Sequence, residues 1–285
     1  MQKNKSAKHV YVGGVGRSGT TWCTEIINAQ ECYKESFEPY IHYLDLGLGY
    51  TPFLPKDEQL GSDITGRLSE MVTVSSPAAL TLVKDIRCNL MLSWLQHNTP
   101  LTHLVYIIRN PLQVACSWQK LGWGKALKQE ATDVEVLMQQ NTLIEAYPVI
   151  SDAHKIIESD NRLESAIFVW SVHHLITSMQ IDSNNVHLLY YEDLVLTPEN
   201  EIKKLYAYLG QEFIWSDIEP SVNRFSRSTM PARKKAGKSQ SMIDGWKTTL
   251  TRQEIKRCQL ILDTFGLSDV YLPNGMPSGL GFFLN

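Results

Sequence analysis

A glycine-rich segment near the start of the chain has the composition of a phosphate-binding loop. It reads Gly13-Gly-Val-Gly-Arg-Ser-Gly-Thr-Thr21 and follows a short apolar run. Glycines let the backbone turn tightly and point several N–H groups into one concavity, and a helix that starts there adds the positive end of its dipole. Arg17 supplies a forked positive charge, and Ser18, Thr20 and Thr21 supply hydroxyl donors. The segment therefore predicts a site for a nucleotide-type ligand.

More polar groups follow directly on apolar runs later in the chain. They are Lys84-Asp85, Arg109 and Glu192-Asp193. In an open sheet of parallel strands, ligands bind at the carboxyl ends of the strands. We therefore expect these groups to lie at the same edge as the glycine-rich loop.

Strands and helices alternate around these groups. Strands are predicted at Val10–Gly14, Leu80–Val83, His103–Ile108 and Val186–Tyr190. Helices are predicted at Thr20–Gln30, Asn89–Gln96 and Leu112–Lys120, the last with Pro111 at its first helical position. Two more are predicted, from the Thr197-Pro198-Glu199 segment to Leu209 and from a capping box at Thr251 to Phe265. This order predicts an α/β fold with a central, mainly parallel sheet, helices on both faces and a P-loop-like nucleotide-binding arrangement.

The composition is that of a globular protein. The 285 residues are 43% apolar and 20% charged, with a formal net charge of -3, which favours neither disorder nor nucleic-acid binding. We expect one domain over residues 1–285, in which the less regular segments 40–77 and 123–161 cover the ligand-binding site. The segment Asn223–Gly245 is basic and aperiodic, as is typical of a lid.

Cysteine spacing and hydropathy bear on the compartment. The five cysteines include no C-x-x-C pair, which argues against a metal centre or a disulfide framework and favours a reducing compartment. The apolar region of a signal peptide does not follow Met1–Lys8, and no apolar run approaches the ~20 residues that span a bilayer. The expectation is a cytoplasmic protein without a membrane span or a nucleic-acid partner.

Two other nucleotide-binding loops share part of this pattern. Gly14 and Gly19 have the spacing of a P-loop kinase or NTPase, but Thr20 stands where the phosphate-binding lysine is required. Gly14-x-Gly16-x-x-Gly19 also matches a dinucleotide loop, yet no strand ends in an acidic residue ~20 residues further on. A nucleotide-binding module without catalysis stays a third alternative.

Three segments in order resemble the sulfotransferases that use 3'-phosphoadenosine 5'-phosphosulfate (PAPS). Gly16–Trp22 is similar to that family's loop for the 5'-phosphosulfate, and Val105–Trp118 to its strand and helix for the 3'-phosphate. Leu189–Glu199, followed by a helix ending in Leu209-Gly210, resembles its Y-E-D-L segment. The resemblance extends over roughly residues 9 to 250. It implies in-line transfer of a sulfuryl group from PAPS to a hydroxyl or amine, without a metal.

The resemblance also implies roles for individual residues. Arg17 would neutralise the bridging oxygen, the N–H groups of residues 18–21 would hold the 5'-phosphate, Arg109 and Ser117 would bind the 3'-phosphate, and Trp22 would stack on adenine. The family's late donor-binding segment is recognisable at Gly245-Trp-Lys247, and Lys238 lies nearer to it than the basic residues Arg233-Lys-Lys235. The donor-binding set is therefore Gly16, Arg17, Ser18, Gly19, Thr20, Thr21, Trp22, Arg109, Ser117 and Lys238.

The acceptor must lose a proton, so a general base is expected. The family's cytosolic members carry a histidine after the lysine of the second strand, but here Lys84 is followed by Asp85. Glu38, in a segment similar to that of the polysaccharide-modifying members, is the first candidate, followed by Asp85 and His42. Lys84 would lie near the transferring group. The acceptor class stays open between a small molecule, a lipid and a carrier-tethered chain.

Overall fold

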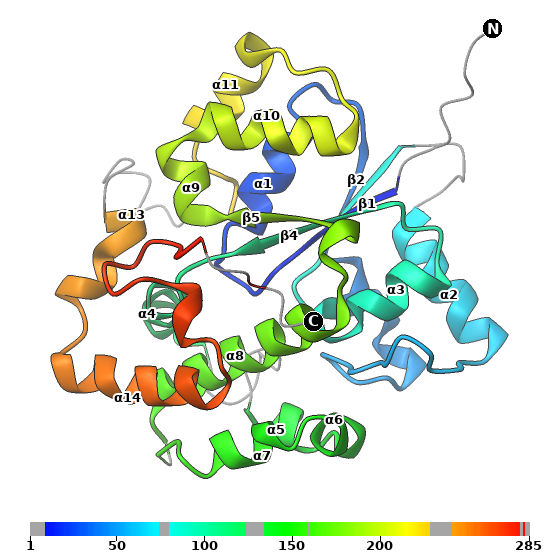
Figure 1. Cartoon of the computed structure of the whole chain (residues 1–285). Helices are drawn as coiled ribbons and strands as arrows, with labels where there is room; N and C mark the ends of the chain where they lie inside the picture. Colours follow the sequence, from blue (N-terminus) through cyan, green and yellow to red (C-terminus); the bar gives the residue numbers. More distant parts are fainter. Residues whose placement is uncertain are drawn as a thin grey trace, which may run out of the picture.

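The protein is built around one parallel β-sheet, seen in a computed structural model that describes residues 9–73, 80–123, 134–158, 160–228, 241–279 and 282 (Figure 1). Its five strands lie in the order β2-β3-β1-β4-β5. Their bounds are His9–Gly13 (β1), Lys34–Phe37 (β2), Thr81–Lys84 (β3), His103–Ile108 (β4) and Val186–Tyr190 (β5). After β1 the chain forms the edge strand β2, returns to β3 beside β1, and then crosses to β4 and β5 on the other side, so the loop after β1 lies at the point where the strand order reverses.

Alternate residues of the strands contribute to two separate cores. On one face Val10 and Val12 pack with apolar residues of α1 (Thr20–Ile27) and α10 (Pro198–Leu209). On the other face Tyr11 and Tyr106 pack with residues of α4 (Pro111–Leu121) and α8 (Arg162–Gln180). Figure 1 shows helices covering both faces. A sheet buried on both sides explains why β4 is a continuous apolar run.

The remaining helices complete these layers and the connections. On the face of α1 lie α9 (Tyr191–Leu196) and α11 (Trp215–Asn223) (Figure 1). The opposite face carries α2 (Ser62–Thr73), η2 (Cys88–Met91), α3 (Leu92–Asn98) and α14 (Arg252–Thr264). Shorter segments are η1 (Pro39–Leu46), α5 (Val134–Met138), α6 (Asn141–Ala146), α7 (Val149–His154), η4 (Ser183–Asn185), α13 (Ser241–Asp244), η5 (Gly245–Thr248) and η6 (Ser268–Val270).

Local signals placed several helix ends correctly. Asn110 caps α4 by accepting hydrogen bonds from the N–H groups of Leu112 and Gln113, and Pro111 is the first helical residue, as predicted. The capping box at Thr251 is present at the start of α14. Gly210 ends α10 in a left-handed conformation with φ 62°.

The structure contains elements that the sequence analysis did not predict, among them helices α8 and α11. The edge strand β2 was missed, because Lys34-Glu-Ser-Phe37 is polar and largely accessible and so lacks an apolar pattern. Tyr191-Glu192-Asp193, which directly follow the predicted strand, begin helix α9. The segments 40–77 and 123–161, expected to be less regular, contain η1, α2, α5, α6 and α7 among their described residues.

Candidate active site

The predicted polar groups meet at the carboxyl ends of the parallel strands. In the strand register Val12 pairs with Lys84, and Gly13 pairs with Tyr106. The loop after β1, the Lys84-Asp85 segment and the turn after β4 therefore lie at one edge of the sheet (Figure 1). This edge is where an open parallel sheet binds its ligand.

Two glycines of the loop stand at positions where a side chain does not fit. Gly14 has φ 139°, and a Cβ there would lie 2.4 Å from the carbonyl oxygen of Ile107. Gly19 has φ 102°, and a Cβ there would lie 2.6 Å from the ring of Tyr191. Both positions combine a left-handed backbone with close packing, so the loop can follow this path only with glycine.

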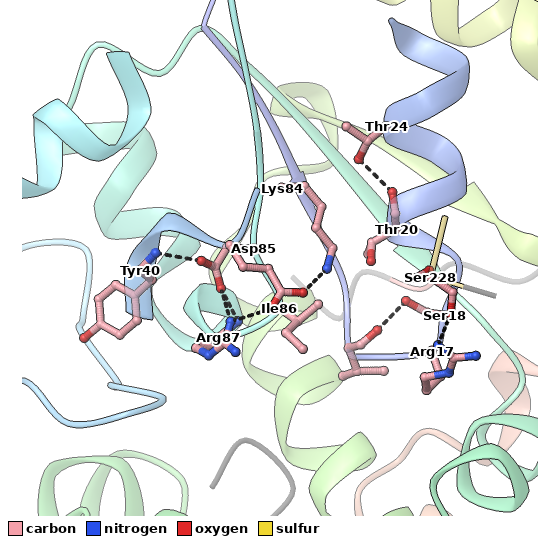
Figure 2. Close-up of polar contacts among 12 residues, drawn as sticks. Arg17, Ser18, Thr20, Thr24, Tyr40, Lys84, Asp85, Ile86, Arg87 and Ser228 are labelled. Carbon is pink, nitrogen blue, oxygen red and sulfur yellow. Dashed lines mark hydrogen bonds and ion pairs between the residues drawn. The ribbon is translucent and has the colours of Figure 1, made fainter. Parts of the chain in front are cut away.

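The start of α1 offers donors to an anion. Gly19 occupies the N-cap position, and no described side chain caps the helix. Thr20 and Thr21 are buried at the first two helical positions. The hydroxyl of Ser18, by contrast, donates to the carbonyl oxygen of Val15 at 2.6 Å and so stabilises the loop itself (Figure 2). Unsatisfied N–H groups at a helix start are a preferred site for phosphate.

The two arginines of the predicted donor site are in contact. Nη1 of Arg109 donates to the carbonyl oxygen of Arg17 at 2.8 Å, and its Nη2 donates to the carbonyl oxygen of Met242. The guanidinium carbon of Arg109 lies 4.0 Å from the centre of the Tyr191 ring. Nε of Arg109 is buried without a hydrogen-bond partner among the described residues. Nε of Arg17 donates to Oγ of Ser117 at 3.3 Å.

Glu38 lies against two cations. Lys84 Nζ forms an ion pair with Oε1 of Glu38, and Nη1 of Arg87 forms a second with Oε2 at 2.9 Å. The backbone N–H of Glu38 also donates to the carbonyl oxygen of Lys84 at 2.6 Å. Burial by itself raises the pKa of the Glu38 carboxyl, but Lys84 and Arg87 together hold this pKa below its ordinary value. Burial lowers the pKa of the Lys84 ammonium, although Glu38 opposes that effect.

Asp85 and His42, the other two candidates for the base, occupy different surroundings. Asp85 is 0% exposed, and its oxygens accept from the N–H groups of Tyr40 at 2.8 Å and of Arg87 at 2.9 Å (Figure 2). Burial raises the pKa of Asp85, while Arg87 opposes this. His42 is exposed on η1.

A buried carboxylate binds the backbone of the turn after β4. Oε1 of Glu192 accepts from the N–H of Asn110 at 3.0 Å, and Oε2 accepts from the hydroxyl of Tyr271 at 3.0 Å. Burial raises the pKa of Glu192 to about 6, although the Asn110 hydrogen bond and the charge of Arg109 oppose it. Glu192 therefore stabilises the backbone of the turn that carries Arg109.

The Trp22 ring is largely buried by its neighbours, so little of its surface is open for stacking. Its indole N–H donates to the carbonyl oxygen of Ser221 at 3.3 Å, and its ring meets Tyr191 edge-on at 5.9 Å. It is 7% exposed. The adenine contact predicted for Trp22 stays a prediction, and Lys238 lies outside the described residues.

The sequence analysis missed two side chains that shape the site. Arg87 forms ion pairs with both Glu38 and Asp85. Its position three residues after Lys84 was a sequence signal that this second cation could belong to the site. Oδ1 of Asn89 accepts a hydrogen bond from the N–H of Gly14 at 2.9 Å, and no local pattern predicts this contact.

Within the described part of the chain, no group of three His, Cys, Asp or Glu residues is arranged to hold a metal. No helix there is long and apolar enough to cross a membrane.

Comparison with known proteins identifies the family. A model of the sulfotransferase domain matches residues 7–263. The chain belongs to the sulfotransferase family. Its function is therefore transfer of a sulfuryl group, and the comparisons give no support to a kinase or NTPase. A search of curated proteins found no match.

Solved structures share the fold at low identity. The sulfotransferase domain from the curacin biosynthetic pathway has 15% identity and a TM-score of 0.54, over 91% of this chain and 98% of that one. Mouse sulfotransferase SULT7A1, complexed with PAP, has 14% identity and a TM-score of 0.51, over 92% and 86%. Sulfotransferase STF9 from Mycobacterium avium has 12% identity and a TM-score of 0.50, over 91% and 76%.

Proposed function

We propose that this sulfotransferase takes its sulfuryl group from PAPS and transfers it to a hydroxyl or amine of a small-molecule, lipid or carrier-tethered acceptor. The observation that carries the proposal is Arg109. It is 9% exposed, its Nε is unpartnered, and within the described residues no carboxylate pairs with it. The carboxylate of Glu192 acts on Arg109 only from beyond ion-pair distance, and a buried guanidinium without a close ion pair is stabilised when a ligand supplies negative charge. A 3'-phosphate is the charge by which PAPS differs from other adenine nucleotides.

The glycine loop suits the other end of the donor. A 5'-phosphosulfate placed at the start of α1 would accept hydrogen bonds from the N–H groups of Thr20 and Thr21 and benefit from the helix dipole. Lys84, at the end of the adjacent strand β3, would add a full positive charge. A mouse relative described in complex with PAP supports a donor of this class.

Glu38 is the proposed base, and Lys84 connects it to the donor. Glu38 would accept the acceptor's proton while the acceptor oxygen or nitrogen forms a bond to sulfur. The bond from sulfur to the bridging oxygen breaks, and PAP leaves with the electron pair. Because Lys84 pairs with Glu38, an anionic donor that draws on the charge of Lys84 would raise the proton affinity of Glu38. Donor binding would thus make Glu38 a stronger base.

The geometry favours Glu38 over the other two candidates. Both oxygens of Asp85 accept backbone N–H groups, and the side chain has no exposed surface, so an acceptor cannot reach it. His42 is exposed on η1, and within the described residues it forms no hydrogen bond or ion pair with Lys84. Glu38, with 21% of its side chain exposed, is accessible as well as paired.

Nucleotide binding tests the donor. Adenosine 3',5'-bisphosphate should raise the thermal unfolding midpoint, and Mg-ATP at the same concentration should raise it far less. Stabilisation by Mg-ATP alone would contradict the proposed donor. Acceptors can then be screened with PAPS by mass spectrometry for the mass of one sulfuryl group.

Substitution of Glu38 tests the base. Glu38→Gln keeps the size of the side chain and removes its proton affinity, so turnover should fall by about 10²–10⁴-fold. Binding of adenosine 3',5'-bisphosphate should change less than about threefold, because the nucleotide ligands stay in place. Glu145→Gln, at an exposed position, is the matched control and should retain activity. Full turnover by Glu38→Gln would exclude Glu38 as the base.

A further inference from the structure

Arg227, in the segment after α11, binds two carboxylates that belong to different elements. Its Nη1 donates to Oε2 of Glu35 at 3.1 Å, and its Nη2 donates to Oε1 of the same carboxylate. Its backbone N–H donates to Oε1 of Glu25 at 2.9 Å. Glu35 belongs to the edge strand β2 and Glu25 to α1. Arg227 therefore connects β2 to the helix that begins at the phosphate-binding loop.

Arg227 also contacts the ring of Phe37, which in turn contacts Lys84. The centre of the ring lies 4.6 Å from the guanidinium carbon of Arg227 and 4.6 Å from Nζ of Lys84. Phe37 and Lys84 are paired in the parallel register, and both point to the α1 face, where Leu82 of the same strand packs. Because the ring is 44% exposed, packing alone leaves it room to move, and the two cation contacts restrict it.

The strand β2 depends on such contacts because it has little apolar surface of its own. Its sequence is Lys34-Glu-Ser-Phe37, and it lies at the edge of the sheet next to β3. The residue that follows it, Glu38, has φ 50°, a left-handed conformation that is unfavourable for a residue with a side chain. A conformation of this kind persists only where the surrounding structure holds it. Arg227 supplies part of that structure.

The ion pairs of Arg227 have the geometry in which such pairs contribute to stability. The guanidinium group binds Glu35 with both of its terminal nitrogens, and its Nε lies 3.9 Å from Glu25. The side chains of Glu25 and Glu35 are only 9% and 22% exposed, so water screens their charges incompletely. A bidentate arginine in a network of partly buried carboxylates is stronger than an isolated surface ion pair.

The segment around Arg227 is fixed at the phosphate-binding loop and at α1. The carbonyl oxygen of Ser228 accepts from Nη1 of Arg17 at 3.2 Å (Figure 2). The carbonyl oxygen of Ser221, in α11, accepts from the indole N–H of Trp22 at 3.3 Å. Arg227 therefore binds β2 from a segment that has its own contacts with the loop and with α1.

We infer that Arg227 is a positioning residue for the Lys84–Glu38 pair. It fixes β2 against α1 and restricts the Phe37 ring on the Lys84 ammonium, so that Lys84 stays on Oε1 of Glu38. The inference rests on the proposed role of Glu38 as the base. It adds a residue that itself touches neither the donor nor the acceptor and acts through Phe37.

Chemical labelling of Lys84 tests this positioning without any acceptor. Acetic anhydride acetylates uncharged amines, and peptide mass spectrometry reports the rate at each lysine of the full chain. The Lys84 side chain is 3% exposed and paired with Glu38, so it should react slowly in the wild-type protein. In Arg227→Met its rate should rise by about 5–30-fold, because the charged fork is lost. Lys204, 57% exposed on α10, should keep its rate and serves as the internal standard.

Further variants separate this effect from a general loss of stability. Glu35→Gln should raise the Lys84 rate as Arg227→Met does, and the double variant should add little, because both changes remove the same contact. Phe37→Leu removes the ring and should also raise the rate. Arg224→Met removes an exposed arginine three residues earlier and is the matched control, with no expected change. Thermal unfolding midpoints show whether each variant is folded.

Turnover with PAPS and an acceptor from the mass-spectrometric screen gives the second readout. In Arg227→Met the looser pairing with Lys84 raises the pKa of Glu38, so kcat should fall by about tenfold and the acid limb should move to higher pH. Affinity for adenosine 3',5'-bisphosphate should change by less than about threefold. A residue that only stabilises the fold would leave the acid limb in place.

Two results would overturn the inference. One is a Lys84 labelling rate in Arg227→Met equal to that in Arg224→Met, and the other is an acid limb that does not move. Wild-type protein that fails to bind adenosine 3',5'-bisphosphate would instead overturn the proposed donor, and the labelling result would still stand.

Discussion

Removal of Arg87 should shift the acid limb of the pH–rate profile to higher pH. Arg87 holds one oxygen of Glu38 at 2.9 Å, and together with Lys84 it keeps the pKa of that carboxyl below its ordinary value. A base works in its ionised form, so activity is lost as the pH falls through this lowered pKa. Without Arg87 the pKa of Glu38 rises, and activity is lost at a higher pH.

The distance sets the size of the shift. Two unit charges 2.9 Å apart interact by about 1.4 kcal/mol even at the dielectric constant of water, which corresponds to about one pKa unit. The side chain of Glu38 is 21% exposed, so the effective dielectric constant is lower than that of water and the shift is larger. For Arg87→Met we expect the acid limb of kcat/KM to move up by about one to two pH units.

The assay is sulfuryl transfer from PAPS across the acid range, with circular dichroism at each pH to verify folding. Arg87→Lys preserves the positive charge and should keep the acid limb within about half a unit of wild type. Arg67→Met removes an arginine from the Asp45 ion pair and should leave the profile unchanged. An Arg87→Met profile that superimposes on wild type would refute the reasoning, and so would an equal shift in Arg87→Lys.

Three other substitutions test the scaffold of the site. Gly14→Ala should destabilise the fold by about 3 kcal/mol or more in denaturant unfolding, because its Cβ would lie 2.4 Å from a backbone oxygen at φ 139°. Gly66→Ala in α2 is the control: a Cβ there has nothing within 4 Å, so the substitution should stabilise the fold by about 0.5–1 kcal/mol, and equal effects of the two substitutions would contradict the packing argument. The pKa of Glu192 is about 6 in the folded protein, against an ordinary 4.5, so the native state binds more protons between these values and its stability should fall by about 2 kcal/mol as the pH rises through them. Glu192→Gln should remove this slope, and a variant with the wild-type slope would show that another group titrates. Asn110→Ala removes the cap of α4 and should cost about 1 kcal/mol, with weaker binding of adenosine 3',5'-bisphosphate; unchanged stability would argue against the cap.

Local sequence was sufficient for the elements that carry their own pattern. β4 and β5 have the predicted bounds, because an apolar run bounded by polar residues is a property of consecutive residues. The same holds for the Pro111 helix start and the Thr251 capping box, whose hydrogen bonds span three residues. The edge strand β2 carries no such pattern, and only its pairing with β3 makes it a strand.

Sequence alone also indicated which residue types gather at the strand ends, since parallel strands present their carboxyl ends on one edge. It did not determine which of them touch. Glu38 meets Lys84 across 46 residues of chain, and Arg17 meets Ser117 across 100. Such contacts depend on strand order, register and the left-handed turn at Arg17, and these arise only when the sheet is assembled. The sequence thus determined a phosphate-binding sulfotransferase fold, and the tertiary structure decided that Glu38 is the carboxylate paired with Lys84 and that the Arg17 side chain contacts Ser117.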